Sequence, residues 1–405
     1  MVATFHFGIG TSCQLELDDV AYVRPASHES ISPEELAEHI RAALEMPVGY
    51  PPLAEAAVPG DRVVVALQHG LPLVKQILAG TSAALRDAGV EPSQATFLYT
   101  QEMARSDSLL DLLAAESDIR LERHDPTNTK DCSFFGVTQS GQGLRMNRKL
   151  CDADVVLPIG LTTVGLDQQQ CDKYGGLFPH FCDEETIARY HDCKKADSAK
   201  HGENRRREID ESGWLLGVGM TVQVVPGASG TVAAVLAGEP TAVAQAATEK
   251  YREVWSRPVA ARGDLVIATI TGPTGEQSWD SFARALTAAE NVLEPGGAIA
   301  IYSELADAPG PSLRRLIGSG DYTRLERKLQ RDRFADSRTA LLVCRALEQG
   351  PIYLHSQLDA NVVEGLGLAP IASEAELLRL AKSYRCPVVL EDAHRLLPTL
   401  SEQSL

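Results

Sequence analysis

Thiols and imidazoles are concentrated in one short stretch of the sequence, and these side chains bind metals. Thiolate and imidazole ligands suit zinc or nickel. A structural zinc site usually shows Cys-x-x-Cys spacing, which is missing here, and Pro179 with two preceding glycines prevents one continuous helix. Two interpretations stay open: a zinc or nickel site with His191 as a ligand, or reduced buried cysteines that bind nothing. The six residues are Cys171, His180, Cys182, His191, Cys193 and His201.

Two residues that follow predicted strands are candidates for acid–base catalysis. His69 follows a strand at 62–67, and an imidazole can accept or donate a proton near neutral pH. Glu102 follows a strand at 95–99 and is a candidate acid or base. The alternatives are a histidine that only makes local hydrogen bonds in a turn, and a plain solvated carboxylate.

Two stretches are rich in basic residues. Acidic residues interleave in the first, which favours an exposed helix face with ion pairs between residues four apart. The alternative is a site for the phosphate or carboxylate group of a ligand. The second stretch, at 314–338, indicates an exposed helix and a subunit contact, so a homo-oligomer is one expectation. The basic residues of the first stretch are Lys194, Lys195, Lys200, Arg205, Arg206 and Arg207.

Alternating strand and helix patterns must position these residues. Continuous apolar runs indicate parallel strands buried on both faces, separated by segments with helical spacing. We predict an α/β fold with two α/β domains, mainly parallel sheets and an interdomain cleft, divided into 1–255 and 256–405. Ligands bind at the carboxyl ends of such strands. The predicted strands are 62–67, 95–99, 119–122, 154–160, 265–270, 298–302, 352–354 and 387–390, and the helices are 73–88, 108–115, 279–293 and 373–384.

Composition excludes several classes of partner. The chain has 405 residues and a formal net charge of −17, which repels nucleic acid and anionic membranes. No run of 18 apolar residues occurs, so no membrane span is expected. Eight cysteines are few for a disulfide scaffold, and no secretory signal is visible. A cytoplasmic protein is therefore expected, and an anionic metabolite would have to be attracted by local basic residues.

Common nucleotide and hydrolase motifs are missing from the sequence. Gly-x-Gly-x-x-Gly between a strand and a helix, the phosphate-binding loop and Gly-x-Ser-x-Gly do not occur. Ordinary dinucleotide enzymes, nucleoside triphosphatases and serine hydrolases are therefore not favoured.

Residues 43–65 resemble the signature segment of the nickel-dependent lactate racemase family. They contain Pro-x-Gly-x-Pro-x-Leu at 47–53 and Pro-Gly-Asp at 59–61, before the first sheet strand. Further similar segments follow in the same order as in the family. These segments are 124–126, 146–148, 152–156, 159–160, 186–187, His191 and 272–290.

The resemblance implies a racemase or epimerase that acts on a 2-hydroxy acid. Members of the family use a nickel-pincer nucleotide, which is attached to a lysine and completed by a histidine ligand. The cofactor accepts a hydride, and two histidines exchange the hydroxyl proton on opposite faces of the substrate. An arginine pairs with the substrate carboxylate.

The sequence departs from the family at most catalytic positions. Gln68 and Leu71 stand where the family has an acid and an arginine, and Met103 replaces a histidine. Gly165 aligns with the other catalytic histidine. Gly175 aligns with the lysine that anchors the cofactor, and Lys173 can replace that lysine only if the loop is shifted.

These comparisons define the residues to test. We predict His69 and Glu102 as catalytic and His191 as the metal ligand. The expected function is isomerisation of a small 2-hydroxy acid or related anionic metabolite, with altered or lost nickel-pincer chemistry. The alternative is a catalytically inactive ligand-binding or regulatory protein on the same scaffold. The predicted cofactor-binding residues are Gln68, Lys173, Gln277 and Arg284.

Overall fold

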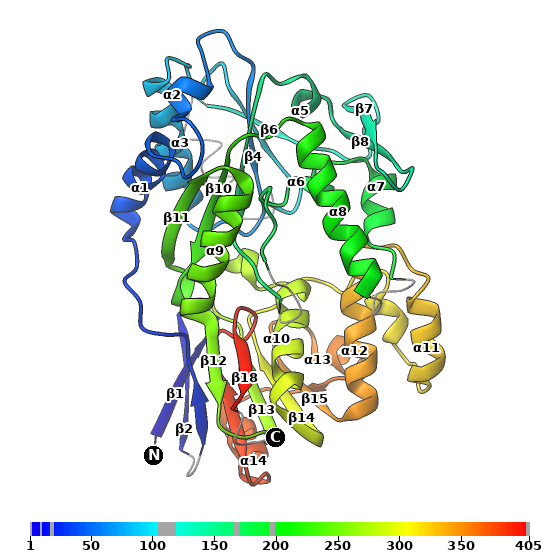
Figure 1. The fold of residues 1–405 in the computed structure, drawn as a ribbon. Helices are drawn as coiled ribbons and strands as arrows, with labels where there is room; N and C mark the ends of the chain where they lie inside the picture. The colour runs from blue at the N-terminus through cyan, green and yellow to red at the C-terminus, as the bar shows by residue number, and fades with distance from the viewer. Residues whose placement is uncertain are drawn as a thin grey trace.

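Two six-stranded sheets organise the chain, as a computed structural model shows. The structure describes residues 2–8, 10–16, 20–103, 119–165, 170–193 and 199–401, so the helix expected at 108–115 lies outside the described residues. The first sheet occupies the upper half of Figure 1 and the second sheet the lower half. The predicted α/β fold with mainly parallel sheets is confirmed.

The first sheet has the strand order β11-β10-β9-β4-β5-β6. The strands from β10 to β6 are parallel, and β11 adds an antiparallel edge. Alternate residues of β4 pack in different cores, so both faces of this strand are covered. The bounds are β4 Val63–Leu67, β5 Thr96–Tyr99, β6 Arg120–Arg123, β9 Val155–Leu161, β10 Thr221–Pro226 and β11 Val232–Gly238.

Helices and one hairpin surround the first sheet. The core on one face is formed with α1 and α3, and α6 contributes to the core on the other face. The hairpin consists of β7 Cys132–Val137 and β8 Gly143–Asn147. The helices are α1 Pro33–Glu45, α2 Leu53–Ala56, α3 Val74–Asp87, α5 Arg148–Asp152, α6 Leu177–His180, α7 Glu184–Tyr190, α8 Ala199–Leu215 and α9 Pro240–Trp255.

The second sheet is parallel throughout, with the order β16-β15-β14-β13-β17-β3. Its strands are β3 Ala21–Val23, β13 Gly263–Thr269, β14 Leu293–Tyr302, β15 Ile352–His355, β16 Ala369–Pro370 and β17 Pro387–Leu390. The helices of this unit are α10 Trp279–Val292, α11 Tyr322–Leu329, α12 Ser337–Gln349, α13 Ala360–Gly365 and α14 Glu374–Lys382.

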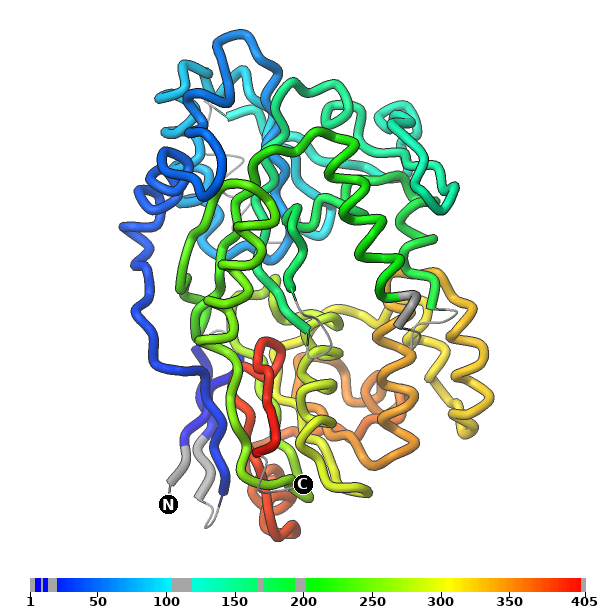
Figure 2. Tube along the Cα trace, viewed as in Figure 1, coloured from blue at the N-terminus to red at the C-terminus, as the bar shows by residue number. Residues whose placement is uncertain are grey.

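The N-terminal strands lie beside the second sheet. Strand β3 pairs with β17, and the hairpin of β1 Val2–Phe7 and β2 Thr11–Glu16 contributes Phe5 and Phe7 to the core against β13 and β14. Figure 2 shows this blue segment next to the red C-terminal segment. A short parallel pair, β12 Ser256–Val259 and β18 Leu397–Leu400, closes the same end. The division at 255/256 stays a prediction.

Local sequence signals explain where the important helices begin. Ser32 and Glu35 form a capping box at the start of α1, which satisfies backbone N–H groups that have no partner within the helix. Ser278 accepts a hydrogen bond from the Ser281 N–H and caps α10. Asp183 caps α7 in the same way. Among the described residues, no helix has the length and apolar character needed to cross a membrane.

Candidate active site

A pair of histidines lies at the carboxyl end of the first sheet. His69 follows β4, His180 ends α6, and their ring centroids are 4.9 Å apart in an edge-to-face arrangement. Burial lowers the pKa of His69, and burial together with the neighbouring His69 lowers the pKa of His180 to about 3. Both imidazoles are therefore neutral at pH 7 and able to accept a proton.

Glu102 lies near this histidine pair, after the neighbouring strand β5. Burial would raise the pKa of Glu102, but hydrogen bonds from the backbone and from the Thr100 side chain lower it. Its carboxylate is therefore ionised at neutral pH. The charge of Glu102 affects the pKa of both His69 and His180, and the ring contact adds His180, which the sequence placed only in a thiol–imidazole stretch. The catalytic roles of His69 and Glu102 stay predictions.

Two charged residues of α10 face the histidines from the second unit. Arg284 and Asp280 form an ion pair with 2.7 Å between Nη2 and Oδ2. Arg284, followed by the histidine pair, lowers the pKa of Asp280 against the effect of burial. The Asp280 side chain is nevertheless 69% exposed, although groups of both units affect its ionisation. Asp280 is therefore an exposed carboxylate of the second unit whose ionisation depends on groups of both units.

His191 lies at the end of α7, on the first-unit side of the cleft. Burial lowers the pKa of His191, and Arg205 lowers it further, while Asp280 and Glu102 act in the opposite direction. The His191 ring packs edge-to-face on Tyr190 at 5.7 Å between centroids.

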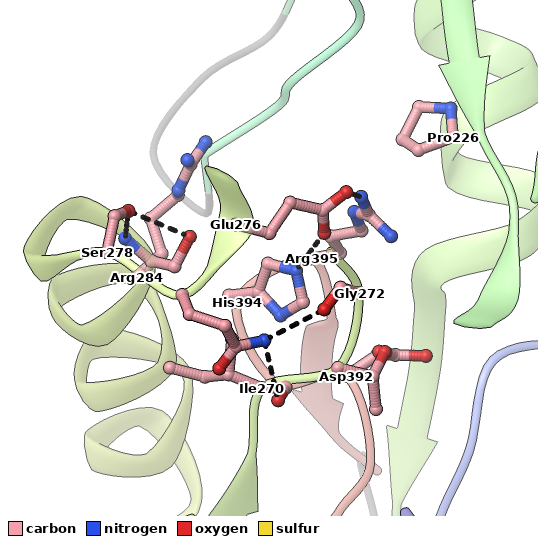
Figure 3. Close-up of polar contacts among 12 residues, drawn as sticks. Pro226, Ile270, Gly272, Glu276, Ser278, Arg284, Asp392, His394 and Arg395 are labelled. Carbon is pink, nitrogen blue, oxygen red and sulfur yellow. Dashed lines mark hydrogen bonds and ion pairs between the residues drawn. The ribbon is translucent and has the colours of Figure 1, made fainter. Parts of the chain in front are cut away.

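A buried polar network holds the loop that precedes α10. The Glu276 carboxylate lies 3.1 Å from His394 Nε2 and 2.5 Å from Arg395 Nη2, and the three side chains are 3–5% exposed. Figure 3 shows Glu276 between these two residues. Arg395 also donates a 3.4 Å hydrogen bond to the Gly227 carbonyl, which follows β10 of the first unit. The network therefore connects the two units and orients the start of α10.

Gln277 belongs to the support of this loop. Its Nε2 donates to the carbonyls of Ile270 and Gly272 at 3.3 and 3.2 Å. Its Oε1 accepts hydrogen bonds from Ser303 Oγ at 2.7 Å and from the Glu304 N–H at 2.9 Å. Because the amide is fully used within the second unit, the predicted cofactor-binding role of Gln277 has no support from this arrangement.

The corner that corresponds to the cofactor-anchoring lysine is filled by backbone. Gly175 has φ +58°, and a Cβ atom there would lie 2.9 Å from the Gly160 nitrogen. Gln68 packs against Gly176 and accepts a hydrogen bond from the Leu161 N–H at 2.9 Å. No side chain fits at position 175 without movement of the adjacent strand end.

Lys173 does not replace the missing anchor. Its Nζ forms an ion pair with Asp210 of α8 at 3.0 Å, and its side chain is partly buried in that contact. The residues of this corner therefore do not fit a lysine-linked pincer nucleotide. Of the four predicted cofactor-binding residues, Gln68 directly precedes His69, and the charge of Arg284 affects the pKa of His69.

The cysteines near the cleft are buried thiols. Burial raises the pKa of Cys171 to about 11 and raises that of Cys182 well above its usual value. Within the ranges that the structure describes, no three His, Cys, Asp or Glu side chains gather as a metal site. A metal on His191 would need ligands beyond these residues. Burial thus disfavours the thiolate form of Cys171 and Cys182, and His191 as a metal ligand stays a prediction.

The first basic stretch is only partly an exposed helix face. Arg206 and Arg207 are exposed as expected, but Arg205 is half-buried and its guanidinium lies 4.9 Å from the centre of the Tyr190 ring. Lys194 and Lys195 lie outside the described residues. The expectation of a solvated face is therefore wrong for Arg205, because α8 packs this residue against the end of α7.

The second basic stretch is not one exposed helix. It runs through the short 3-10 helix Leu313–Leu316, α11 and the start of α12. Arg333 forms an ion pair with Asp192 of the first unit at 3.0 Å, so part of the stretch contacts the other unit of the same chain. A homo-oligomer remains a prediction.

The fold defines a class: α/β proteins with two six-stranded, mainly parallel sheets, here with a histidine pair at the carboxyl end of the first sheet. Residues 9–201 match the family described as the lactate racemase N-terminal domain. The N-terminal part of the chain is therefore similar to this domain family. No curated protein matches the sequence.

Two solved structures resemble the whole fold. The lactate racemase apoprotein from Thermoanaerobacterium thermosaccharolyticum has a TM-score of 0.78 and 18% sequence identity, covering 98% of this chain and 100% of its own. A crystal structure of a protein from Thermotoga maritima has a TM-score of 0.66 and 12% identity, covering 93% of this chain and 100% of its own. At these identities the likeness establishes the fold alone.

Proposed function

We propose that this protein is an isomerase, a racemase or epimerase of a small 2-hydroxy acid or a related anionic metabolite, with chemistry that differs from the pincer mechanism. The observation that carries the proposal is the juxtaposition of His69, His180 and Glu102 with Asp280 and Arg284 across the cleft. Neutral bases opposite a cation are the groups that proton transfer on a carboxylate substrate requires.

Arg284 is the proposed binding group for the substrate carboxylate. Its Nη2 pairs with Asp280, while its Nε is buried without a hydrogen-bond partner among the described residues. A guanidinium can present two parallel N–H donors to a carboxylate. A substrate that replaces or shares the Asp280 contact would be oriented with its second carbon towards the first unit.

His69 and Glu102 are the proposed proton acceptors on the first-unit side. The 4.9 Å between the His69 and His180 rings leaves no room for a substrate between them, so the two imidazoles act on the same face. Inversion requires an acid–base group on the other face. We assign Asp280 to that face because it lies on α10, opposite the histidines.

The family's nickel-pincer nucleotide supplies a hydride acceptor when it is bound. Gly175 and the Lys173–Asp210 ion pair do not support its covalent attachment in this chain. We therefore propose proton transfer at an acidified C–H bond in place of hydride transfer. Zinc or nickel on His191 belongs to this proposal only as an additional charge near the substrate.

Solvent exchange distinguishes the two chemistries. We would incubate the purified protein in D2O with a panel of 2-hydroxy acids and 2-hydroxy-3-oxo acids and follow the C2–H signal by proton NMR. Proton transfer predicts that deuterium replaces this hydrogen as the other enantiomer forms. His69→Gln is expected to reduce the rate at least 100-fold, the usual contribution of a general base. The exposed His39 of α1 provides a matched control, His39→Gln, with an unchanged rate.

Inversion with full retention of the C2 hydrogen would refute proton transfer and indicate hydride transfer. The second candidate function is a catalytically inactive ligand-binding or regulatory protein. The filled corner at Gly175 favours this alternative, because the family's cofactor attachment is lost. Binding of a panel compound without exchange or inversion would support it and would refute the isomerase.

A further inference from the structure

A pocket lies between the β7–β8 turn, the end of α7 and one face of α8. Its volume of about 420 Å³ is within the range of small-molecule sites. Arg189, Arg205 and Arg207 line it together with Glu208 and Glu211. Opposite charges therefore meet in one cavity of metabolite size.

Two of the arginines carry buried N–H groups that have no hydrogen-bond partner among the described residues. Arg189 donates from Nη1 to the Gly143 carbonyl at 3.3 Å, while its Nε and Nη2 are buried without hydrogen-bond partners among the described residues. Arg205 donates to the carbonyls of Tyr190 and Asp192, which hold its guanidinium in place. Its Nε is also buried without such a partner in the described part of the chain. A carboxylate suits several guanidinium donors.

The acidic side of the pocket also has an atom without a hydrogen-bond partner among the described residues. Glu211 Oε2 accepts a hydrogen bond from the Gln139 N–H at 3.0 Å, while Oε1 is buried without a hydrogen-bond partner among the described residues. Glu208 lies 3.9 Å from Arg189 Nη2. The two carboxylates would repel a ligand with net negative charge, and the arginines would repel a cation. A zwitterion satisfies both sides.

We propose that this pocket binds a small amino acid, with its carboxylate on Arg189 and Arg205 and its ammonium group on Glu208 and Glu211. The site does not depend on the proposed isomerase chemistry, because none of its lining residues belongs to the catalytic groups. Asp192, which also lines the pocket, forms the ion pair with Arg333 of the second unit at 3.0 Å. A ligand in this pocket would therefore lie beside an ion pair that joins the two units.

A thermal-unfolding screen of the full chain tests the proposal. Each of the twenty amino acids would be added at 10 mM, with acetate and methylammonium as probes that carry only one of the two charges. We expect at least one amino acid to raise the unfolding midpoint by 2 °C or more, and neither single-charge probe to do so. Calorimetric titration of that amino acid would then give its Kd.

Variants locate the binding. Arg189→Gln is expected to weaken binding at least 10-fold, and Glu211→Gln to weaken it as well. Arg206→Gln removes the same charge from an exposed position of α8 outside the lining and should change the Kd less than 2-fold. The proposal is overturned if no amino acid shifts the midpoint, or if the Arg189 and Arg206 variants have the same Kd. If Arg189→Gln does not fold, Arg207→Gln replaces it with the same expected direction.

Discussion

Substitution of Gly175 by alanine tests whether the backbone around position 175 has room for a side chain. Gly175 has φ +58°, and an added Cβ would lie 2.9 Å from the nitrogen and 3.0 Å from the Cα of Gly160. The left-handed conformation costs a non-glycine residue roughly 1–2 kcal/mol. Forcing an extra carbon into packed backbone adds about 1–3 kcal/mol. We therefore expect Gly175→Ala to lower the free energy of unfolding by about 2–5 kcal/mol.

The control separates the two contributions. Gly141, in the turn between β7 and β8, has φ +80° but no atom within 4 Å of an added Cβ. Gly141→Ala should therefore cost only the conformational part, roughly 1–2 kcal/mol. Urea unfolding followed by circular dichroism measures both variants. Equal losses for the two variants would refute the close contact between Gly175 and Gly160, and a lysine side chain at 175 would then fit.

Three further predictions concern the buried charges and the cofactor. Glu276→Gln leaves the Arg395 charge buried without its partner and should lower the free energy of unfolding, measured in urea, by about 3–5 kcal/mol. The control Glu253→Gln, at an exposed position, should change it by less than 1 kcal/mol. Similar losses for the two variants would contradict the role of the buried network. Because burial depresses the pKa of His180 in the folded state to about 3, the unfolded chain binds the proton first as pH falls below 6.5. Stability should therefore decrease between about pH 6.5 and pH 3, by up to about 1.4 kcal/mol per pH unit, and His180→Gln should flatten this dependence in urea titrations; an unchanged slope would show that His180 does not titrate in this way. Protein from nickel-supplemented cells should show no covalent adduct on Lys173 by intact mass spectrometry, and Lys173→Met should leave its nickel content by elemental analysis unchanged; an adduct on Lys173 would refute the loss of pincer attachment.

The strands were predictable because strands that are buried on both faces consist of continuous apolar runs. Val63–Leu67 is buried at every position, and it forms β4 where the sequence predicts a strand from 62 to 67. The helix expected at 279–293 is α10 Trp279–Val292, which is amphipathic and capped by Ser278. Local propensity and the tertiary environment agree in these segments, so boundaries differ by only one or two residues.

The short N-terminal strands were harder to assign. Strand β3 has three residues, and its place at the edge of the second sheet depends on β17, which is more than 360 residues away. A pairing between such distant segments leaves no local pattern in the sequence. For the same reason, the contact of Arg333 with Asp192 could not be distinguished from an exposed helix or a subunit contact.

The candidate site was partly predictable. His69 and Glu102 follow adjacent strands, and adjacent parallel strands end at the same edge of a sheet, so their proximity follows from topology. His180 was missed as their partner because it comes from a short helix more than 100 residues along the chain from His69. Asp280 had one available signal, the i,i+4 spacing to Arg284, but that pattern is common on solvated helices.

The sequence by itself determined the α/β class, the order of its main elements and the resemblance to lactate racemases. These properties depend on local patterns of burial, turn residues and side-chain identity. Only the tertiary structure decided that His69 and His180 are neutral neighbours, that Lys173 is engaged with Asp210, and that Arg189 and Arg205 share a pocket with Glu208 and Glu211. Proximity, burial and pKa arise from contacts between segments that are distant along the chain, and a one-dimensional pattern does not contain those distances.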